Sequence, residues 1–124
     1  MSSDRFAEWL EDMQQAARLA CSYVEGMRRE DFLADLRTQQ AVAMNVMIIG
    51  EVAAKLIERY PERLRACPNV PWASMKGMRN RIAHGYFEVD MGVVWETVQR
   101  ALPELIDQLQ SIIVQQRLDA SHLP

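Results

Sequence analysis

Most of the groups in this chain that could do chemistry lie within eight consecutive residues. The segment holds two guanidinium groups, an amide, an imidazole and a phenol, in the order Arg79-Asn80-Arg81-Ile82-Ala83-His84-Gly85-Tyr86. Histidine titrates near neutral pH, so it can remove a 2′-hydroxyl proton or protonate a leaving oxygen. Arginine is permanently charged and matches phosphate geometry, so it can stabilise a developing oxyanion. These residue types suit metal-free cleavage of RNA.

The spacing of apolar residues places this segment at the end of a helix. Four of them recur at helical intervals: Trp72, Met75, Met78 and Ile82. They predict a helix that runs from Trp72 to His84. We expect Gly85 to end this helix in the left-handed conformation, which glycine adopts without a Cβ penalty. His84 would then lie in the last turn, where the helix dipole favours the imidazolium.

Arg79 and His84 have the clearest chemical roles, and they are five residues apart. On an ideal helix this separation corresponds to about 140° of rotation. The two side chains can therefore converge in three ways. The last turn distorts, the long arginine reaches round the helix, or a second subunit completes the site. A purely structural role is also open, because histidine and arginine near a helix C-terminus commonly compensate the dipole.

Four further residues are candidates for supporting roles. Asn80 lies on the same helix face as the histidine four residues later. Lys76 and Arg81 form a local basic patch with Arg79 that could contact RNA. Tyr86 lies past the glycine, where its side chain either reaches solvent or packs as a half-buried ring. No cluster of acidic, histidine or cysteine ligands accompanies the segment, so neither a metal ion nor a cofactor is expected.

The rest of the chain reads as helices that must position this segment. Periodicity and capping residues predict an all-α, antiparallel bundle of four to five helices in a single domain, residues 1–124. The first expected helix runs from about Asp4 to Met27, and a short helix capped by Asp31 follows at Phe32–Leu36. The second long helix runs from Thr38 to Tyr60, where Pro61 stops it, and Pro61–Ala66 forms one turn. After the motif helix, Asp90 caps a last helix that ends near Ile112.

Two segments near the C-terminus are expected to depart from regular helix. Tyr86 to Val89 should be extended or turn-like. Pro103 should kink or restart the last helix, because it lacks an N–H and clashes with the preceding turn. Gln115 to Pro124 is expected to be a polar, disordered tail in which His122 is solvated.

The middle of the second long helix, Val42 to Ala53, is apolar on almost every face. A domain this small can hardly bury such a helix by itself, which favours a homodimer. Glu51 interrupts the apolar run and leaves two possibilities open. It forms an i,i+4 ion pair with Lys55, or it reaches the motif and orients Arg79 or His84.

Composition excludes several classes of protein. The 124 residues are 49% hydrophobic with only five glycines and five prolines, which suits one ordered domain. The net charge of −3 means that any contact with RNA must be local. We expect no signal peptide at the N-terminus, and no apolar run reaches the about 18 uncharged residues that a membrane span requires. Cys21 and Cys67 show no metal-binding spacing, so we expect reduced thiols in a cytoplasmic protein.

The motif and its surroundings resemble a known family. Arg79-x4-His84-x-Tyr86 resembles the signature of the HEPN superfamily, and most closely that of the HepT-like toxins. Ile48-Ile49-Gly50-Glu51-Val52-Ala53-Ala54-Lys55 is similar to the second long helix of that family. Three further segments also match it: Pro71-Trp72, Val94-Trp95-Glu96 and Leu102-Pro103-Glu104-Leu105. The resemblance covers most of the chain, from Asp4 to Ile113.

The resemblance implies a HEPN bundle that works as a two-fold dimer with its motif helices facing each other. It implies a metal-independent endoribonuclease toxin with Arg79 and His84 as catalytic residues. Asn80, Tyr86 and Glu51 would be supporting groups. The implied partner is a cognate minimal nucleotidyltransferase antitoxin that attaches AMP to Tyr86, adding negative charge and bulk to a cationic cleft. The competing expectation is a non-catalytic HEPN module whose cations only hold a nucleotide or a partner protein.

Overall fold

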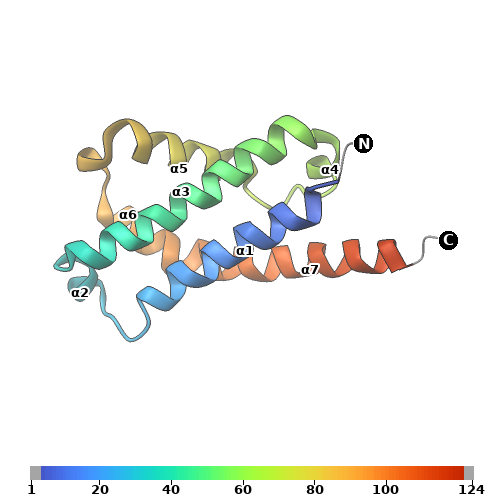
Figure 1. Cartoon of the computed structure of the whole chain (residues 1–124). Helices are drawn as coiled ribbons and strands as arrows, with labels where there is room; N and C mark the ends of the chain where they lie inside the picture. Colours follow the sequence, from blue (N-terminus) through green and yellow to red (C-terminus); the bar gives the residue numbers. More distant parts are fainter. Residues whose placement is uncertain (1–3, 122–124) are drawn as a thin grey trace.

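Four long helices carry the fold, and the longest of them, α3, lies between two others (Figure 1). The computed structural model describes residues 4–121 of the chain. The long helices are α1 (Phe6–Tyr23), α3 (Leu36–Arg59), α5 (Trp72–Gly85) and α7 (Leu102–Ser121). Shorter elements connect them: α2 (Arg29–Leu33), α4 (Pro61–Arg65), the 3₁₀ turn η1 (Tyr86–Glu88), α6 (Met91–Glu96) and the π-helical turn η2 (Thr97–Ala101). Neighbouring long helices run antiparallel, so the expected all-α bundle is confirmed.

The order of packing leaves α5 on the outside. Helix α3 packs against α1 on one side and α5 on the other, while α7 packs against α1 (Figure 1). Most of the packing of α5 is therefore against α3 alone. Only Trp72 and Ile82 of its fourteen residues are buried. The helix that carries the motif consequently presents most of its surface to solvent.

Local sequence explains where several helices begin. The Asp35 carboxylate caps α3 by accepting hydrogen bonds from the Thr38 backbone N–H at 3.1 Å and from its hydroxyl at 2.7 Å. Asp90 caps α6 as expected, with Oδ1 accepting from the Gly92 N–H at 2.8 Å. Asp31 was expected to precede its short helix. Instead it lies within α2 and accepts from the Arg28 N–H at 2.9 Å, because the helix starts earlier, at Arg29.

The end of α5 differs from the expected left-handed glycine. Gly85 has φ −164° and ψ 60°, so it is not in the left-handed region, and the chain passes straight into η1. The Val89 N–H donates to the Tyr86 carbonyl at 3.1 Å, which closes this tighter turn. Tightening the last turn to 3₁₀ hydrogen bonding pairs groups that a helix end would otherwise leave open. The turn-like alternative for residues 86–89 is therefore the correct one.

Pro103 does perturb the last helix, in a specific form. The chain widens into the π-helical turn η2 before Pro103, which is the second residue of α7. The wider turn accommodates a residue that lacks an N–H and crowds the carbonyl four residues earlier. The expected disordered tail is wrong for residues 115–121, because α7 continues to Ser121. Arg117 pairs with Glu11 of α1 at 2.6 Å and anchors this extension, whereas His122 lies outside the described residues.

Helix α3 is buried more completely by the single chain than expected. Six apolar residues of its middle are buried: Val42, Ala43, Val46, Ile49, Val52 and Ala53. Met44, at 59% exposure, and Ile48, at 40%, remain on the surface. By length and composition α3 is apolar enough to cross a membrane, but half of its most apolar stretch is buried inside the bundle. That burial is typical of the central helix of a soluble domain.

Candidate active site

The position of α5 is set by a close approach to α3 at Gly50. A Cβ atom at this position would lie 2.6 Å from the Met75 carbonyl oxygen and would collide with the Arg79 Cβ. The two helices therefore touch almost backbone to backbone at the level of the motif arginine. Any side chain at position 50 would push α5 outward. Gly50 thus determines how closely the Cβ atom of Arg79 approaches α3.

Arg79 extends towards α3 and is held by Glu51. Its Nη1 donates to Oε1 and Oε2 of Glu51 at 3.2 and 3.3 Å. The arginine side chain is 22% exposed and the glutamate 52%. Lys55 instead lies over the Trp9 ring, with its Nζ 5.9 Å from the centroid. Of the two roles that the sequence left open for Glu51, the structure therefore supports orientation of Arg79.

His84 lies on a different side of α5, in an open hollow of about 500 Å³. The hollow is lined by residues of α5, η1 and α6: Arg81, His84, Gly85, Glu88, Val89, Asp90 and Val93. Arg79 does not line it. The backbone leaves helical geometry only at Gly85, after His84, and the Arg79 guanidinium is paired with Glu51, so in one chain Arg79 is not part of the hollow at His84. A site that needs both groups is incomplete in one chain.

Of the two positions left open for the Tyr86 side chain, the structure shows the half-buried ring. Its hydroxyl is buried and has no hydrogen-bond partner among residues 4–121. The ring packs at the edge of the core, and its centroid lies 5.7 Å from that of the Phe87 ring. The 3₁₀ turn keeps residue 86 in line with Ile82 on the inward side, so the half-buried alternative is correct. Phe87 points outward instead and is 98% exposed.

The remaining candidates are on the solvent-facing surface of α5 but do not form one patch. Asn80 and Arg81 are exposed and Lys76 is half-buried. Lys76 and Arg81 form no ion pair with any described residue, so both are free to bind an anion. They are five residues apart and hence on different sides of the helix. The expected basic patch is divided between the α3 side and the hollow at His84.

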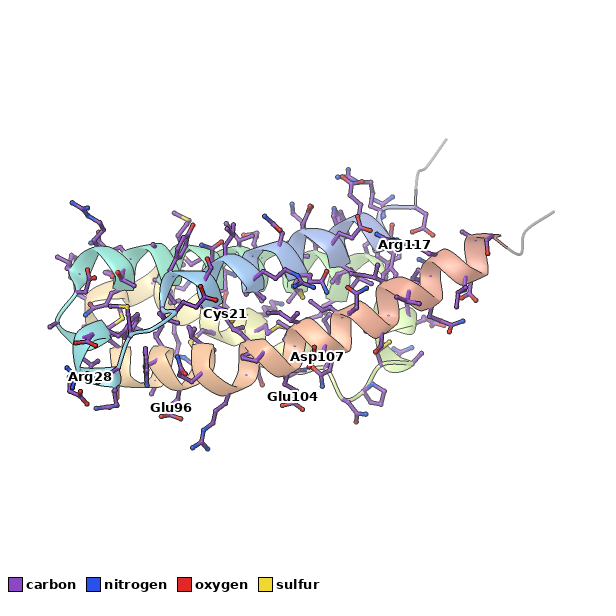
Figure 2. All side chains as sticks on the ribbon, turned by 90° about the horizontal axis from the view of Figure 1, so that it is seen from below. Cys21, Arg28, Glu96, Glu104, Asp107 and Arg117 are labelled. Atoms are coloured by element: carbon purple, nitrogen blue, oxygen red, sulfur yellow. The ribbon has the colours of Figure 1, made fainter. Side chains whose placement is uncertain are left out.

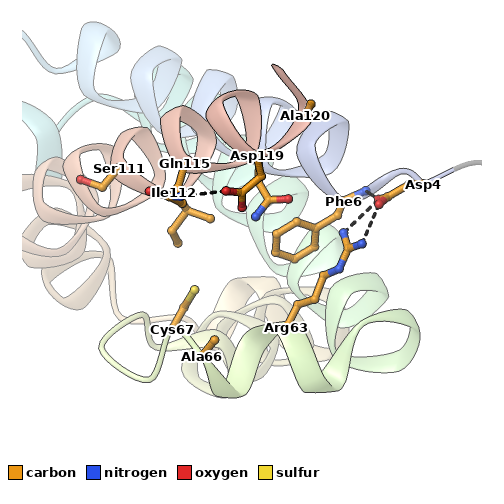
Figure 3. Close-up of a pocket in the computed structure, with 11 residues that line it drawn as sticks. Asp4, Phe6, Arg63, Ala66, Cys67, Ser111, Ile112, Gln115, Asp119 and Ala120 are labelled. Carbon is orange, nitrogen blue, oxygen red and sulfur yellow. Dashed lines mark hydrogen bonds and ion pairs between the residues drawn. The ribbon is translucent and has the colours of Figure 1, made fainter. Parts of the chain in front are cut away.

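Other surfaces are less suited to RNA. Along α6 and α7 the side chains of Glu96, Glu104 and Asp107 lie on one side of the bundle (Figure 2), and Glu96 is paired with Arg100 at 3.2 Å. A larger hollow of about 710 Å³ lies between α4 and the end of α7, where Arg63 forms a two-point ion pair with Asp4 (Figure 3). Hydrogen bonding to Arg63 lowers the pKa of Asp4. This hollow is lined by no residue of α5.

Neither cysteine nor a ligand cluster adds chemistry to the motif. Burial raises the pKa of the Cys21 and Cys67 thiols, so both remain protonated at neutral pH. Among the described residues, no group of three histidine, cysteine, aspartate or glutamate side chains is arranged to hold a metal ion.

A helical bundle that carries Arg79 and His84 on its outermost helix defines a HEPN-type protein. Residues 13–112 match the family described as ribonuclease HepT-like, and the chain belongs to this family. It is similar to a protein named probable ribonuclease HepT from Thermococcus cleftensis, with 38% identity over 105 residues, covering 85% of this chain and 93% of that protein. It is also similar to a candidate RNase of Caldanaerobacter subterraneus, with 31% identity over 109 residues, covering 88% and 95% of the two chains. No solved structure matches the chain.

The structure also identifies two residues of this region that sequence reasoning did not assign a role. Gly50 was part of the resemblance, but its contact with α5 depends on packing between residues far apart in the chain. Glu88 reaches the His84 hollow because η1 turns it back towards α5. No spacing rule in the sequence signals either contact.

Proposed function

We propose that this protein is a metal-independent endoribonuclease that acts in the cytoplasm as the toxin of a toxin–antitoxin pair. One observation carries the proposal. The complete Arg79-x4-His84 pair lies on the least covered helix, with the guanidinium held by Glu51 and the imidazole open to solvent. The relatives named as ribonucleases support the choice of RNA as substrate.

The chemistry follows from the two side chains. One imidazole removes the proton of a ribose 2′-hydroxyl, and the 2′-oxygen forms a bond to the adjacent phosphorus. The bond from phosphorus to the 5′-oxygen breaks, and a second imidazole gives that oxygen a proton. The Arg79 guanidinium stabilises the charge that develops on the phosphate oxygens. The products are a 2′,3′-cyclic phosphate and a 5′-hydroxyl.

A two-fold dimer supplies both imidazoles and joins the separated groups. A two-fold axis placed beside α5, at the level between Arg81 and Ile82, lies midway along the helix between residues 79 and 84. Antiparallel pairing of two α5 helices about this axis brings His84 level with the partner's Arg79. Phe87 of η1, two residues beyond the end of α5, is 98% exposed, and Met44 of α3 is 59% exposed. Burying these apolar side chains would stabilise such a dimer.

Regulation is proposed to act through Tyr86. A cognate minimal nucleotidyltransferase would transfer AMP from ATP to the phenol oxygen and release pyrophosphate. The buried hydroxyl requires η1 to open before this transfer. Once modified, the side chain could not return to its place beside the core, and its phosphate would compete with RNA for Arg79.

The proposal is tested with the purified chain and end-labelled RNA. We expect internal cleavage that leaves cyclic phosphate ends and persists in EDTA. Loss of cleavage on chelation would disprove metal independence. RNA or nucleotide binding without cleavage would favour the alternative, a non-catalytic HEPN binding module, which the separation of Arg79 and His84 in a single chain would also suit.

A further inference from the structure

The hollow at His84 contains charged groups that the proposed cleavage does not use. Arg81 and Glu88 line it and form no ion pair with any residue in 4–121. Asp90 is committed to α6, because its Oδ1 accepts from the Gly92 N–H at 2.8 Å and the Val93 N–H at 3.4 Å. Among the described residues that line this hollow, Glu88 is therefore the carboxylate with both oxygens free to accept hydrogen bonds from a ligand.

Glu88 folds back over the end of α5 and lines the same hollow as His84. It is the last residue of η1, and its Oε2 lies 3.5 Å from the point where a Cβ on Gly85 would be. The carboxylate thus folds back over Gly85, next to His84 in the chain. Glycine at position 85 leaves this space open. The hollow also has an apolar side formed by Val89 and Val93, the latter 49% exposed.

A carboxylate beside a phosphate-binding site opposes the binding of a polyanion unless the ligand offers it hydrogen-bond donors. In single-stranded RNA the base edges are accessible and provide such donors. Guanine presents two adjacent donors, N1–H and N2–H, which match the two oxygens of a carboxylate. Adenine, cytosine and uracil place an acceptor next to the donor on the same edge, and that acceptor would repel one carboxylate oxygen.

We propose that this hollow binds a guanine base next to the scissile phosphate, with Glu88 accepting hydrogen bonds from N1–H and N2–H. The Arg81 guanidinium stacks on the base plane, and Val89 and Val93 contact its other atoms. This inference rests on the proposed ribonuclease function, because the bound backbone at His84 is what delivers the base to the hollow. Glu88 is therefore a specificity-determining residue.

The test uses short RNAs that contain one cleavage site and differ only in the nucleotides on either side of it. The wild-type dimer should prefer guanine at one of these positions by roughly 5- to 150-fold in kcat/KM, the range for a bidentate base contact. In Glu88→Gln one oxygen is replaced by a donor, and the preference should fall at least about fivefold. Glu104→Gln, an exposed glutamate of α7, is the matched control and should keep the wild-type preference.

Two results would overturn the inference. The first is wild-type cleavage with no preference for guanine. The second is a Glu88→Gln protein that keeps its preference for guanine while the pH dependence of its cleavage shifts by the same amount on every RNA. That result would make Glu88 a residue that positions His84 and does not contact the base. If the wild type cleaves none of the RNAs, the proposed function fails separately. Titration with GMP and AMP then decides on the hollow, because only selective GMP binding that Glu88→Gln weakens would support it.

Discussion

Arg79 and Glu51 form an ion pair whose value lies in orientation rather than in stability. Glu51 is about half exposed, so the pair contributes roughly 0–1 kcal/mol to folding. The ion pair holds the long, flexible side chain of Arg79 against α3. The guanidinium therefore lies outside the hollow that His84 lines. A guanidinium that is already oriented loses little conformational freedom when phosphate binds.

Arg79→Ala and His84→Ala should each lower RNA cleavage by roughly 100-fold or more while the protein stays folded. Neither side chain belongs to the buried core, so circular dichroism and the thermal midpoint should change little. Arg100→Ala is the control, because Arg100 is exposed and pairs only with Glu96. Full activity in a folded His84→Ala protein would remove the histidine from the chemistry.

Tyr86→Phe should keep most of the cleavage activity and escape modification by the partner nucleotidyltransferase. The proposed cleavage assigns proton transfer to His84, so it does not need the Tyr86 hydroxyl. The hydroxyl is buried and has no hydrogen-bond partner within the described part of the chain, so its removal should leave stability unchanged or raise it by about 1 kcal/mol.

Co-expression with the nucleotidyltransferase, followed by intact-mass measurement, checks this role of Tyr86. AMP increments should appear on the wild type and be absent from the Phe variant. Modification at another residue, or equal neutralisation of both proteins, would leave Tyr86 as a packing residue.

At the scale of elements, the contact between α3 and α5 positions the site. Helix α5 has little other support, so a change at Gly50 moves the whole motif rather than one side chain. The chain offers a matched pair of helical glycines to test this. Gly50 faces the backbone of α5, whereas a Cβ on Gly77 would meet nothing within 4 Å.

Gly50→Ala should destabilise the protein by about 1–3 kcal/mol, the range for overpacking a tight contact, and should lower cleavage strongly. Gly77→Ala should raise the free energy of unfolding by about 0.5–1 kcal/mol, because alanine loses less backbone entropy in a helix. Chemical denaturation and cleavage assays measure both. Equal tolerance of the two substitutions would show that the close approach does not position α5.

At the scale of the whole molecule, the proposed site with two histidines requires a second copy of the chain. We expect light scattering to report a dimer at micromolar concentration. Phe87→Glu should dissociate the dimer and abolish cleavage. The single chain should stay folded, because the Phe87 ring is 98% exposed and contributes little to its core. Leu118→Glu is the control, since Leu118 is also apolar and 49% exposed but lies on α7. A wild-type monomer that cleaves RNA would rule out the two-subunit site.

Local sequence was sufficient for the elements of this fold. Apolar residues at helical spacing, the Asp90 cap and the break at Pro61 act within one or two turns, so they specified the helices and their approximate ends. The motif spacing placed Arg79 and His84 on one helix about 140° apart. That separation left three ways for the two side chains to meet, and the family was evident from the same residues.

Only the tertiary structure decided which groups meet. Glu51 pairs with an arginine 28 residues away, and Arg117 of α7 pairs with Glu11 of α1. The turn η1 buries the Tyr86 hydroxyl and brings Glu88 into the hollow that His84 also lines. Helical periodicity determines the face on which a side chain lies, but not which neighbouring helix covers that face or how closely. Those contacts depend on the packing of segments far apart in the chain, such as the approach of α5 to Gly50.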